Sequence, residues 1–318
     1  MSVVSSRHLV DPQLLPMLDA FPTMALSEAV LPAMRSRPPW FGVDPADVER
    51  TDLTVSDIPG PAGAPDVKVL FYRPKGVEGP LPCILHIHGG GFVGGDAVGM
   101  EGGHRPLVAD LGCCLLSVNY RLAPETRFPG AVEDCYAALA WLVANAADLG
   151  VDPARIGVMG ESAGGGLAAA LALLVRDRGE YAFTFQHLIY PMIDDRTCVH
   201  PDPHPYVGEY IWTPHNNHFG WSCLLGHEPG QEGVSPYAAA ARAEDVSGLP
   251  PTFISTGSLD LFLEEDLEYA RRLLRAGVPT ELHVYPGGFH AFNIAPGAEI
   301  AAMARRDSRA ALARALKA

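Results

Sequence analysis

Short apolar runs alternate along most of this chain with longer segments of helical character. Residues 155–159 form one such run, which is short, apolar and partly β-branched, as buried strands are. Residues 165–175 follow it and are rich in Ala and Leu, which predicts a buried helix. The same pattern predicts strands at 83–87, 115–118, 252–257 and 281–285, and helices from near Gly130 and over 265–276. This alternation predicts an α/β fold, with a mostly parallel central sheet flanked by helices.

Two segments depart from that rhythm. Residues 1–48 contain many prolines around short helical fragments such as 24–34, and residues 192–237 combine prolines with aromatic residues. Between them, a first pair of strands is expected at 50–56 and 67–73, separated by a turn rich in proline and glycine. The regular part of the fold is therefore expected to begin near residue 50.

The pentapeptide Gly160-Glu161-Ser162-Ala163-Gly164 lies between the strand at 155–159 and the helix at 165–175. A Gly-x-Ser-x-Gly sequence at a strand-to-helix turn lifts a serine hydroxyl above the sheet, and its glycines leave room where a Cβ would collide. The helix then directs the positive end of its dipole at the serine. Ser162 is the candidate nucleophile. For this segment alone, the alternative is a glycine-rich turn of another α/β protein, including one that holds a phosphate.

A second glycine-rich loop, His88-Gly89-Gly90-Gly91, follows the strand at 83–87. Acyl transfer develops negative charge on an oxygen, which converging N–H groups stabilise. Consecutive glycines let backbone N–H groups converge without side chains in the way. A loop of this type is the oxyanion-hole partner of the Gly-x-Ser-x-Gly turn in lipases and esterases.

A serine nucleophile at such a turn needs an acid and then a histidine further along the chain. Asp260 lies just past the strand at 252–257, and His290 lies in the loop after the strand at 281–285. Both are therefore expected at the edge of the parallel sheet where Ser162 lies. Acidic residues are common at helix starts, and a histidine inside a strand is commonly packed or half-exposed, so other candidates are weaker. These are Glu264, Glu265, Asp266 and His283.

Together these motifs resemble those of the bacterial hormone-sensitive-lipase-like (family IV) esterases of the α/β-hydrolase superfamily. The resemblance runs from about residue 65 to the end of the chain and rests on residues 88–91, 119–125, 160–165, 260 and 285–292. It implies the α/β-hydrolase fold and a carboxylesterase whose catalytic triad is Ser162, Asp260 and His290. It also implies an oxyanion hole formed by the N–H groups of Gly90, Gly91 and Ala163.

Two positions depart from the family's pattern. Glu161 precedes the nucleophile where the family most often has Asp, and Leu261-Phe262 follow the acid where Pro-Leu is frequent. Neither position supplies an atom of the triad. The longer carboxylate at 161 is expected to alter contacts with neighbouring loops.

The resemblance further implies a helical cap built from the N-terminal segment and from an insertion after the strand beyond the nucleophile. In this chain the cap is expected to comprise residues 1–48 and 192–237, and the α/β-hydrolase core residues 49–191 and 238–318. Aromatic side chains of the cap either line an acyl or alcohol pocket or pack the cap onto the core. The candidates are Trp212, Phe219 and Trp221 in the insertion, and Phe21, Trp40 and Phe41 in the N-terminal segment.

The loop at residues 120–125 contains Arg121 and Glu125 beside Pro124. Charge-assisted hydrogen bonds from these two side chains are expected to hold the loop beneath the site. Direct binding of substrate is the alternative.

Composition and charge narrow the class of protein. The chain has 318 residues, of which 48% are hydrophobic, enough for one continuous core. Its formal net charge of −14 argues against nucleic acid and anionic membranes as partners.

No basic segment followed by a sustained apolar run is seen at the start. Two of the six cysteines are adjacent and two fall in expected core elements, so we expect buried thiols and a cytoplasmic location.

No cofactor or metal is expected. His86 and His88, and likewise His215 and His218, have spacings that place two rings on one face, but no cysteine or carboxylate set completes either pair. The glycine runs lack the Gly-Lys-Ser/Thr sequence of a phosphate-binding loop.

The expected function is hydrolysis of short- to medium-chain acyl esters through an acyl-enzyme on Ser162. A related hydrolase of lactones, aryl amides or acetylated sugars would use the same residues. A non-catalytic small-molecule receptor on this scaffold is disfavoured because nucleophile, acid and base positions are all filled. Members of the family often form homodimers through their last strand and helix, here the strand at 281–285 and the C-terminal helix.

Overall fold

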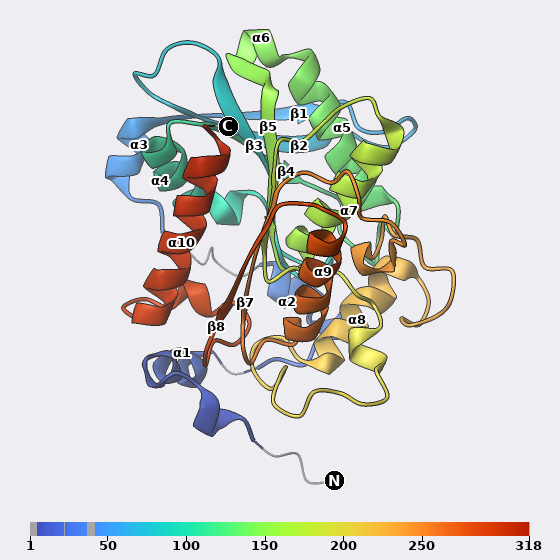
Figure 1. The fold of residues 1–318 in the computed structure, drawn as a ribbon. Helices are drawn as coiled ribbons and strands as arrows, with labels where there is room; N and C mark the ends of the chain where they lie inside the picture. The colour runs from blue at the N-terminus through green and yellow to red at the C-terminus, as the bar shows by residue number, and fades with distance from the viewer. Residues whose placement is uncertain (1–4, 22, 37–41, 318) are drawn as a thin grey trace.

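A computed structural model describes residues 5–21, 23–36 and 42–317, which form an eight-stranded sheet with helices on both faces (Figure 1). The strands are β1 (Thr51–Ile58), β2 (Val67–Pro74), β3 (Leu81–Ile87), β4 (Cys114–Asn119), β5 (Val151–Glu161), β6 (Gln186–Ile189), β7 (Thr252–Gly257) and β8 (Thr280–Tyr285). They lie in the order β1-β2-β4-β3-β5-β6-β7-β8. β2 runs antiparallel to β1 and β4, and the remaining neighbours are parallel. The expected mostly parallel α/β sheet is confirmed.

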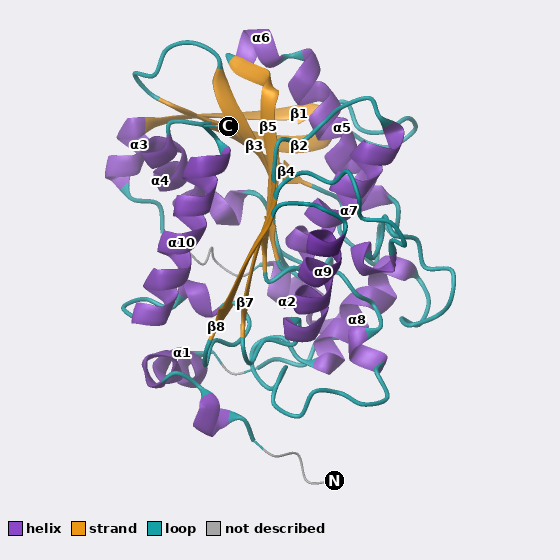
Figure 2. Ribbon diagram, in the orientation of Figure 1, coloured by secondary structure: helices purple, strands orange, loops and turns teal. Residues whose placement is uncertain are grey.

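Two layers of helices cover the sheet, as Figure 2 shows by its colours. On one face lie α3 (Pro45–Arg50), α4 (Glu101–Leu111) and α10 (Glu299–Ala315); on the other lie α5 (Gly130–Ala144), α7 (Ala163–Arg178) and α9 (Leu263–Arg275). The short α6 (Ala146–Leu149) follows α5. Leu107 and Leu312 pack with strand residues on the first face, while Leu139 and Leu273 do so on the second. The sheet is therefore buried on both sides, as parallel sheets are.

Helix α7 approaches the sheet closely because its first turn carries glycines. A Cβ at Gly164 would lie 2.1 Å from the carbonyl oxygen of Ile87 on β3. A Cβ at Gly160, the last residue before the Glu-Ser pair, would lie 2.3 Å from the carbonyl oxygen of Gly164. Both distances are shorter than any real carbon–oxygen contact, so larger residues would separate the helix from the strands. The predicted strand-to-helix turn is confirmed, with both elements longer than expected.

The N-terminal segment differs from its expected helical fragment at residues 24–34. A short 3₁₀ turn, η3 (Glu28–Val30), and helix α2 (Leu31–Arg35) begin later than predicted, after α1 (Leu15–Ala20). The backbone before these two elements is hydrogen-bonded to the side chain of Asn216. Leu26 N donates to Asn216 Oδ1 at 2.8 Å, and Asn216 Nδ2 donates to the carbonyl oxygen of Met24 at 2.9 Å. Hydrogen bonds to another segment thus replace the intrahelical ones that a longer helix would make.

The first strand pair is confirmed: β1 and β2 pair antiparallel from Thr51 with Pro74 to Ile58 with Val67. The interruption at residues 192–237 is also present. It contains the short η5 (Thr197–Val199) and the helix α8 (Pro214–Leu225), with no strand among its residues. Over the described ranges, no helix combines the length and apolar character that crossing a membrane requires.

His187 on β6 is a buried titratable side chain within the core. Its ring stacks on Phe253 of β7 with 4.2 Å between centroids, and its Nε2 lies 2.8 Å from Ser308 Oγ on α10. Burial lowers the pKa of His187 to about 3. The ring therefore stays neutral in the folded protein at pH values where an unfolded chain would protonate it.

We predict that this residue makes the protein less stable in mild acid. An unfolded histidine has a pKa of about 6.5, so below that pH the unfolded state binds a proton that the folded state excludes. The free energy of unfolding therefore falls as the pH is lowered from 7, and His187 accounts for about 2 kcal/mol of the loss at pH 5. In urea titrations, the free energy of unfolding of the wild type should fall between pH 7 and pH 5 by about 2 kcal/mol more than that of His187→Phe. The surface variant His227→Gln should follow the wild type, and equal losses in all three proteins would contradict the prediction.

Candidate active site

Ser162 occupies the turn between β5 and α7 in a conformation that is rare for residues other than glycine. Its φ is 55° and its ψ is −123°, outside the main allowed regions of an L-residue. The surrounding backbone holds it there. Its N–H donates to the carbonyl oxygen of Ile189 at 2.9 Å, and its carbonyl oxygen accepts from Gly166 N and Met192 N, each at 2.9 Å. The turn is thus tied to its own helix and to the end of β6.

A continuous chain of hydrogen bonds joins Ser162, His290 and Asp260. His290 Nε2 lies 3.0 Å from Ser162 Oγ, and His290 Nδ1 lies 2.9 Å from Asp260 Oδ2 and 3.2 Å from Oδ1. An ionised carboxylate only accepts hydrogen bonds, so Nδ1 carries the proton and Nε2 is left to accept from the serine hydroxyl. All three residues are at least nine-tenths buried. The arrangement can therefore move a proton from Ser162 onto His290.

Three parallel strands bring these residues to one edge of the sheet. Ser162 follows β5, Asp260 follows β7 and His290 follows β8, each at the carboxyl end of its strand. The Asp260 carboxylate is fixed further because Oδ1 accepts from Phe262 N at 3.1 Å. The sequence placed all three at this edge, and the structure brings them together.

The competing residues lie elsewhere. Glu264 is exposed, and His283 on β8 is half-buried, with its Nε2 2.8 Å from Glu281. Glu265 is buried and accepts from the backbone N–H groups of Ile193 at 2.7 Å and Asp194 at 3.2 Å. Burial, together with Asp194, raises the pKa of the Glu265 carboxyl well above its usual value. Glu264, Glu265 and Asp266 form the first turn of α9, as expected.

Aromatic rings surround His290 on several sides. The rings of Tyr190 and Phe262 pack against the imidazole in T-shaped geometry, with 4.8 and 5.2 Å between ring centroids, and the Trp212 ring lies 6.3 Å away. The Tyr190 hydroxyl donates to Asn293 Oδ1 at 2.9 Å, which ties the end of β6 to the loop that carries His290. Sequence patterns singled out Trp212 but gave no signal for Tyr190. These rings limit the rotation of the imidazole and exclude water around it.

The loop after β3 forms a tight turn over the same edge. Gly90 and Gly91 have φ values of 126° and 62°, which favour glycine. The carbonyl oxygen of Gly90 accepts from Val93 N at 3.2 Å and Gly94 N at 2.9 Å. Among the hydrogen bonds of the described residues, none uses the N–H of Gly90 or Gly91 as donor. Ala163 is the first residue of α7, so its N–H also has no partner within that helix.

His88 supports this loop from beneath. Its Nδ1 lies 2.9 Å from the carbonyl oxygen of Gly89, and its ring stacks on Tyr120 at 4.3 Å. The Tyr120 hydroxyl donates to the carbonyl oxygen of His88 at 2.9 Å. Burial lowers the pKa of His88 to about 4. A neutral ring thus connects the glycine loop to the loop after β4.

Trp212 closes the glycine loop from the side of the insertion. A Cβ at Gly91 would lie 2.0 Å from the Trp212 ring, so only glycine allows this approach. The indole is held because its Nε1 donates to Asn217 Oδ1 at 3.1 Å. Trp221, in contrast, packs against Phe92 and is fully buried. Trp212 therefore reaches the site, whereas Trp221 packs residues 192–237 against the loop after β3. Phe219 is half-buried against the same core, Phe21 is exposed, and Trp40 and Phe41 lie outside the described residues.

Arg121 and Glu125 make the charge-assisted bonds expected of them, but with partners that the sequence did not indicate. The Arg121 guanidinium pairs with both oxygens of the fully buried Asp134 on α5, at 2.6 to 3.1 Å. Glu125 pairs with Arg35 of the N-terminal segment at 2.7 and 2.9 Å. The loop is therefore held between α5 and α2.

Glu161 has a defined role in this structure. Its two carboxylate oxygens lie 3.0 and 3.1 Å from His86 Nε2 on β3, and His86 Nδ1 lies 3.2 Å from Ser117 Oγ on β4. His86 is fully buried. The longer carboxylate thus reaches across to the neighbouring strand and provides a partner for a buried imidazole.

Metal-ligand groups and disulfides are not found in the described part of the chain. No cluster of three or more His, Cys, Asp or Glu side chains there has the arrangement of a metal site. The six cysteines are free.

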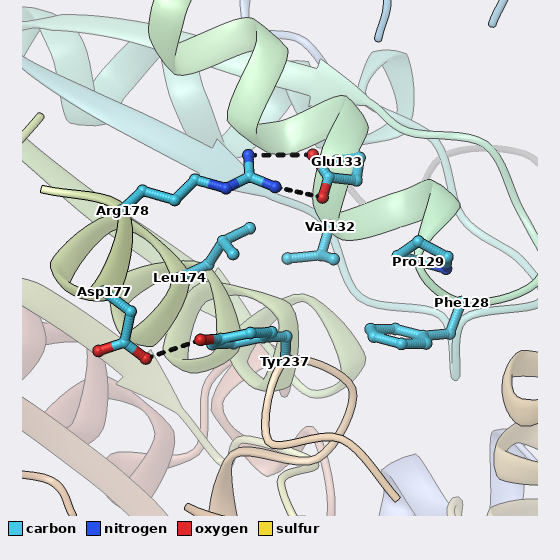
Figure 3. A pocket seen from close by; sticks show the side chains of 8 residues that line it. All are labelled: Phe128, Pro129, Val132, Glu133, Leu174, Asp177, Arg178 and Tyr237. Carbon is cyan, nitrogen blue, oxygen red and sulfur yellow. Dashed lines mark hydrogen bonds and ion pairs between the residues drawn. The ribbon is translucent and has the colours of Figure 1, made fainter. Parts of the chain in front are cut away.

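A cavity of about 380 Å³ lies away from Ser162, between α5, α7 and the segment before β7 (Figure 3). Leu174, Val132 and Phe128 line it, and its polar side chains are paired with one another. Arg178 pairs with Glu133, and the Tyr237 hydroxyl donates to Asp177 at 2.8 Å. The charged side chains of this cavity are paired with one another, and Ser162, Asp260 and His290 are not among the residues that line it. The cavity therefore does not belong to the candidate active site.

We predict that Glu161→Asp destabilises the protein. The shorter side chain withdraws its carboxylate from His86 and leaves a buried nitrogen without a partner, which costs about 1 to 3 kcal/mol. Urea unfolding monitored by fluorescence would measure the loss. Glu161→Gln keeps the length and one acceptor oxygen, so its loss should be smaller. A Glu161→Asp protein as stable as the wild type would contradict this role for the pair.

Known proteins that are similar to this chain are α/β hydrolases and esterases. A family model described as an α/β-hydrolase fold matches residues 84–294. The chain is 34% identical to carboxylesterase NlhH of Mycobacterium tuberculosis over 98% of each chain. It is 33% identical to an ethyl acetate hydrolase of Pseudomonas putida over 70% of each chain.

Solved structures show the same relationship. The structure of a bacterial heroin esterase superposes with a TM-score of 0.87 at 38% sequence identity, covering 98% of this chain and 99% of the other. The similarity extends over nearly the whole length of both chains. The chain therefore belongs to the α/β-hydrolase fold family, among its hormone-sensitive-lipase-like esterases.

Proposed function

We propose that this protein is a serine carboxylesterase that hydrolyses short- to medium-chain acyl esters through an acyl-enzyme on Ser162. Its general class is that of a carboxylic ester hydrolase, as its relatives are. The observation that carries the mechanism is the hydrogen-bonded chain from Ser162 Oγ through His290 to Asp260, with links of 3.0 and 2.9 Å. A catalytic triad of Ser162, Asp260 and His290 uses each of these links.

In the acylation half of the proposed reaction, Ser162 Oγ bonds to the carbonyl carbon of the ester as His290 Nε2 takes the hydroxyl proton. Asp260 keeps the proton of Nδ1 in place and stabilises the imidazolium. The tetrahedral intermediate then expels the alcohol, which takes the proton from Nε2, and the acyl group remains on Ser162. In the second half, His290 Nε2 takes a proton from water as the water oxygen bonds to the acyl carbon. The bond from that carbon to Ser162 Oγ then breaks, Oγ takes the proton from Nε2, and the acid is released.

The proposed oxyanion hole consists of the N–H groups of Gly90, Gly91 and Ala163. Two features support it: the glycines have no backbone acceptor among the described residues, and Ala163 begins a helix whose positive end faces the serine. Preorganised donors of this type stabilise the tetrahedral intermediate more than the substrate, and the loss of one costs about 3 to 4 kcal/mol.

Short or medium acyl chains are proposed for two reasons. Trp212 and the surrounding rings crowd His290, and Ser162 is itself only 7% exposed. The relative named as an ethyl acetate hydrolase is a precedent for a small ester in this family.

The proposed organisation is a core of residues 49–191 and 238–318 under a cap of residues 1–48 and 192–237. Its support is the contact between the two cap segments, which Asn216 and His215 make with the backbone of Met24 and Leu26. Limited proteolysis tests it: cleavage within the cap should abolish activity before the core unfolds, and simultaneous loss of both would contradict the division.

We further propose a cytoplasmic homodimer that pairs through β8 and α10. β8 is an edge strand of the sheet, with β7 as its neighbour, and an edge offers unpaired backbone groups. The free cysteines suit a reducing compartment. Light scattering should give twice the 33.9 kDa of one chain, and cell fractionation should recover the activity in the cytosol. A monomer, or activity in another fraction, would contradict the respective proposal.

The proposed function predicts the behaviour of Ser162→Ala toward p-nitrophenyl esters from acetyl to palmitoyl. Wild-type activity should peak at a short or medium acyl chain, and the variant should lose several orders of magnitude in kcat because the nucleophile is absent. Ser247→Ala, at an exposed serine, is the matched control and should retain full activity. Activity that survives Ser162→Ala would rule out the mechanism, whereas a peak at palmitoyl would contradict the chain-length proposal.

A further inference from the structure

We propose that Arg35 of the N-terminal segment is a positioning residue for the oxyanion hole. Its guanidinium would hold the loops after β3 and β4 in the geometry that directs the N–H groups of Gly90 and Gly91 at the substrate. The inference rests on the proposed function, because it concerns the same hole. It goes beyond that function by giving the N-terminal segment a part in the chemical step rather than only in covering the site.

The Arg35 guanidinium binds four acceptor oxygens on two loops. Its Nε donates to the carbonyl oxygen of Val93 at 2.8 Å, and NH2 donates to the carbonyl oxygen of Ala123 at 2.8 Å. NH1 and NH2 also bind the two oxygens of Glu125, at 2.7 and 2.9 Å. The planar, fixed geometry of a guanidinium suits such a set of acceptors, whereas a lysine ammonium does not reproduce it. These contacts lower the pKa of Glu125 to about 2, and the hydrogen bond from Arg35 is the largest cause.

The acceptors of Arg35 are directly connected to the proposed oxyanion hole. Val93 N and Gly94 N both donate to the carbonyl oxygen of Gly90, which closes the turn that contains Gly91. Ala123 N donates to the carbonyl oxygen of Phe92 at 3.0 Å, so the two loops are also bonded to each other. Arg35 therefore holds the turn at Val93, three residues from Gly90, and holds its neighbouring loop at Ala123.

The residue before Arg35 contacts the same turn. A Cβ at Gly94 would lie 2.7 Å from Met34 Cε, which shows that the Met34 side chain lies directly against this glycine. On its other side, the turn meets Trp212, whose ring would collide with a Cβ at Gly91. Helix α2 and the insertion thus contact the turn from two sides. Of these contacts, only those of Arg35 are directional and charge-assisted.

Loss of these contacts is expected to affect the transition state more than substrate binding. The N–H groups must point at the oxygen of the tetrahedral intermediate, and a displacement of about 1 Å can cost about 100-fold in rate. We expect substrate binding to depend mainly on the aromatic rings around His290 and to be less sensitive to this orientation. Without Arg35, kcat should therefore fall while KM changes little.

The test compares Arg35→Ala and Arg35→Lys with the wild type, and uses Arg7→Ala as the matched control. Arg7 lies in the same N-terminal segment and makes an exposed ion pair with Asp19 at 3.0 Å. Hydrolysis of p-nitrophenyl acetate gives kcat and KM. The inhibition constant of a trifluoromethyl ketone reports on the hole itself. Ser162 Oγ adds to the carbonyl carbon of the ketone, and the resulting negatively charged oxygen would lie in the proposed oxyanion hole.

For Arg35→Ala we expect kcat to fall about 10- to 100-fold, with KM within about threefold of the wild type. The inhibition constant of the ketone should rise by the same factor as kcat/KM falls. Arg35→Lys should lie between Arg35→Ala and the wild type, and Arg7→Ala should match the wild type. If Arg35→Ala does not fold, the same correlation for Arg35→Lys decides the question.

Three results would overturn the inference. These are unchanged kcat in Arg35→Ala, a rise in KM alone, and a fall in kcat without weaker binding of the ketone. Failure of the proposed function would give a different result, because the Ser162→Ala variant would then hydrolyse the ester as well as the wild type does. Hydrolysis that depends on Ser162 but not on Arg35 contradicts only the positioning role.

Discussion

The backbone conformation of Ser162 is the constraint on which the rest of the site depends. A positive φ at a residue other than glycine costs about 1 to 3 kcal/mol and persists only where its surroundings hold it. Here the N–H and carbonyl of Ser162 are bonded to the end of β6, to the first turn of α7 and to Met192. Gly160 and Gly164 permit the strand and helix to approach closely enough for those bonds. This turn fixes the hydroxyl where His290 can reach it.

Around this turn, the site is assembled from loops at one edge of the sheet, each fixed by bonds to a neighbour. Glu161 links the turn to His86 on β3, and Tyr190 links β6 to the loop of His290. Arg35 links the N-terminal segment to the loops after β3 and β4. Each of these links is at least partly buried, so it is worth more than its equivalent at the surface. The resulting rigidity suits a reaction whose catalysis depends on donors and acceptors that are already in place.

Sequence patterns predicted most of the sheet and the residues Ser162, Asp260 and His290, because both depend on local signals. Strands show as short apolar runs, and the Ser, acid and His positions follow strand ends in a fixed order. Helix α4 was not predicted: it contains Gly102, Gly103 and Pro106, and forms through the packing of its buried face. The partners of Arg121 and Glu125 lie on α5 and α2. Such long-range pairings leave no trace in local spacing, and neither does the role of Arg35.

The site at which an organophosphate ester modifies the protein shows most directly whether Ser162 is the nucleophile. Diethyl p-nitrophenyl phosphate transfers its phosphoryl group to an activated serine, and peptide mass spectrometry locates the adduct. If Ser162 is the nucleophile, esterase activity will be lost in proportion to modification of Ser162, and modification will be much slower in His290→Ala, where the base is missing. Esterase activity that persists in a protein fully modified at Ser162 would contradict it, as would complete inactivation with Ser162 unmodified.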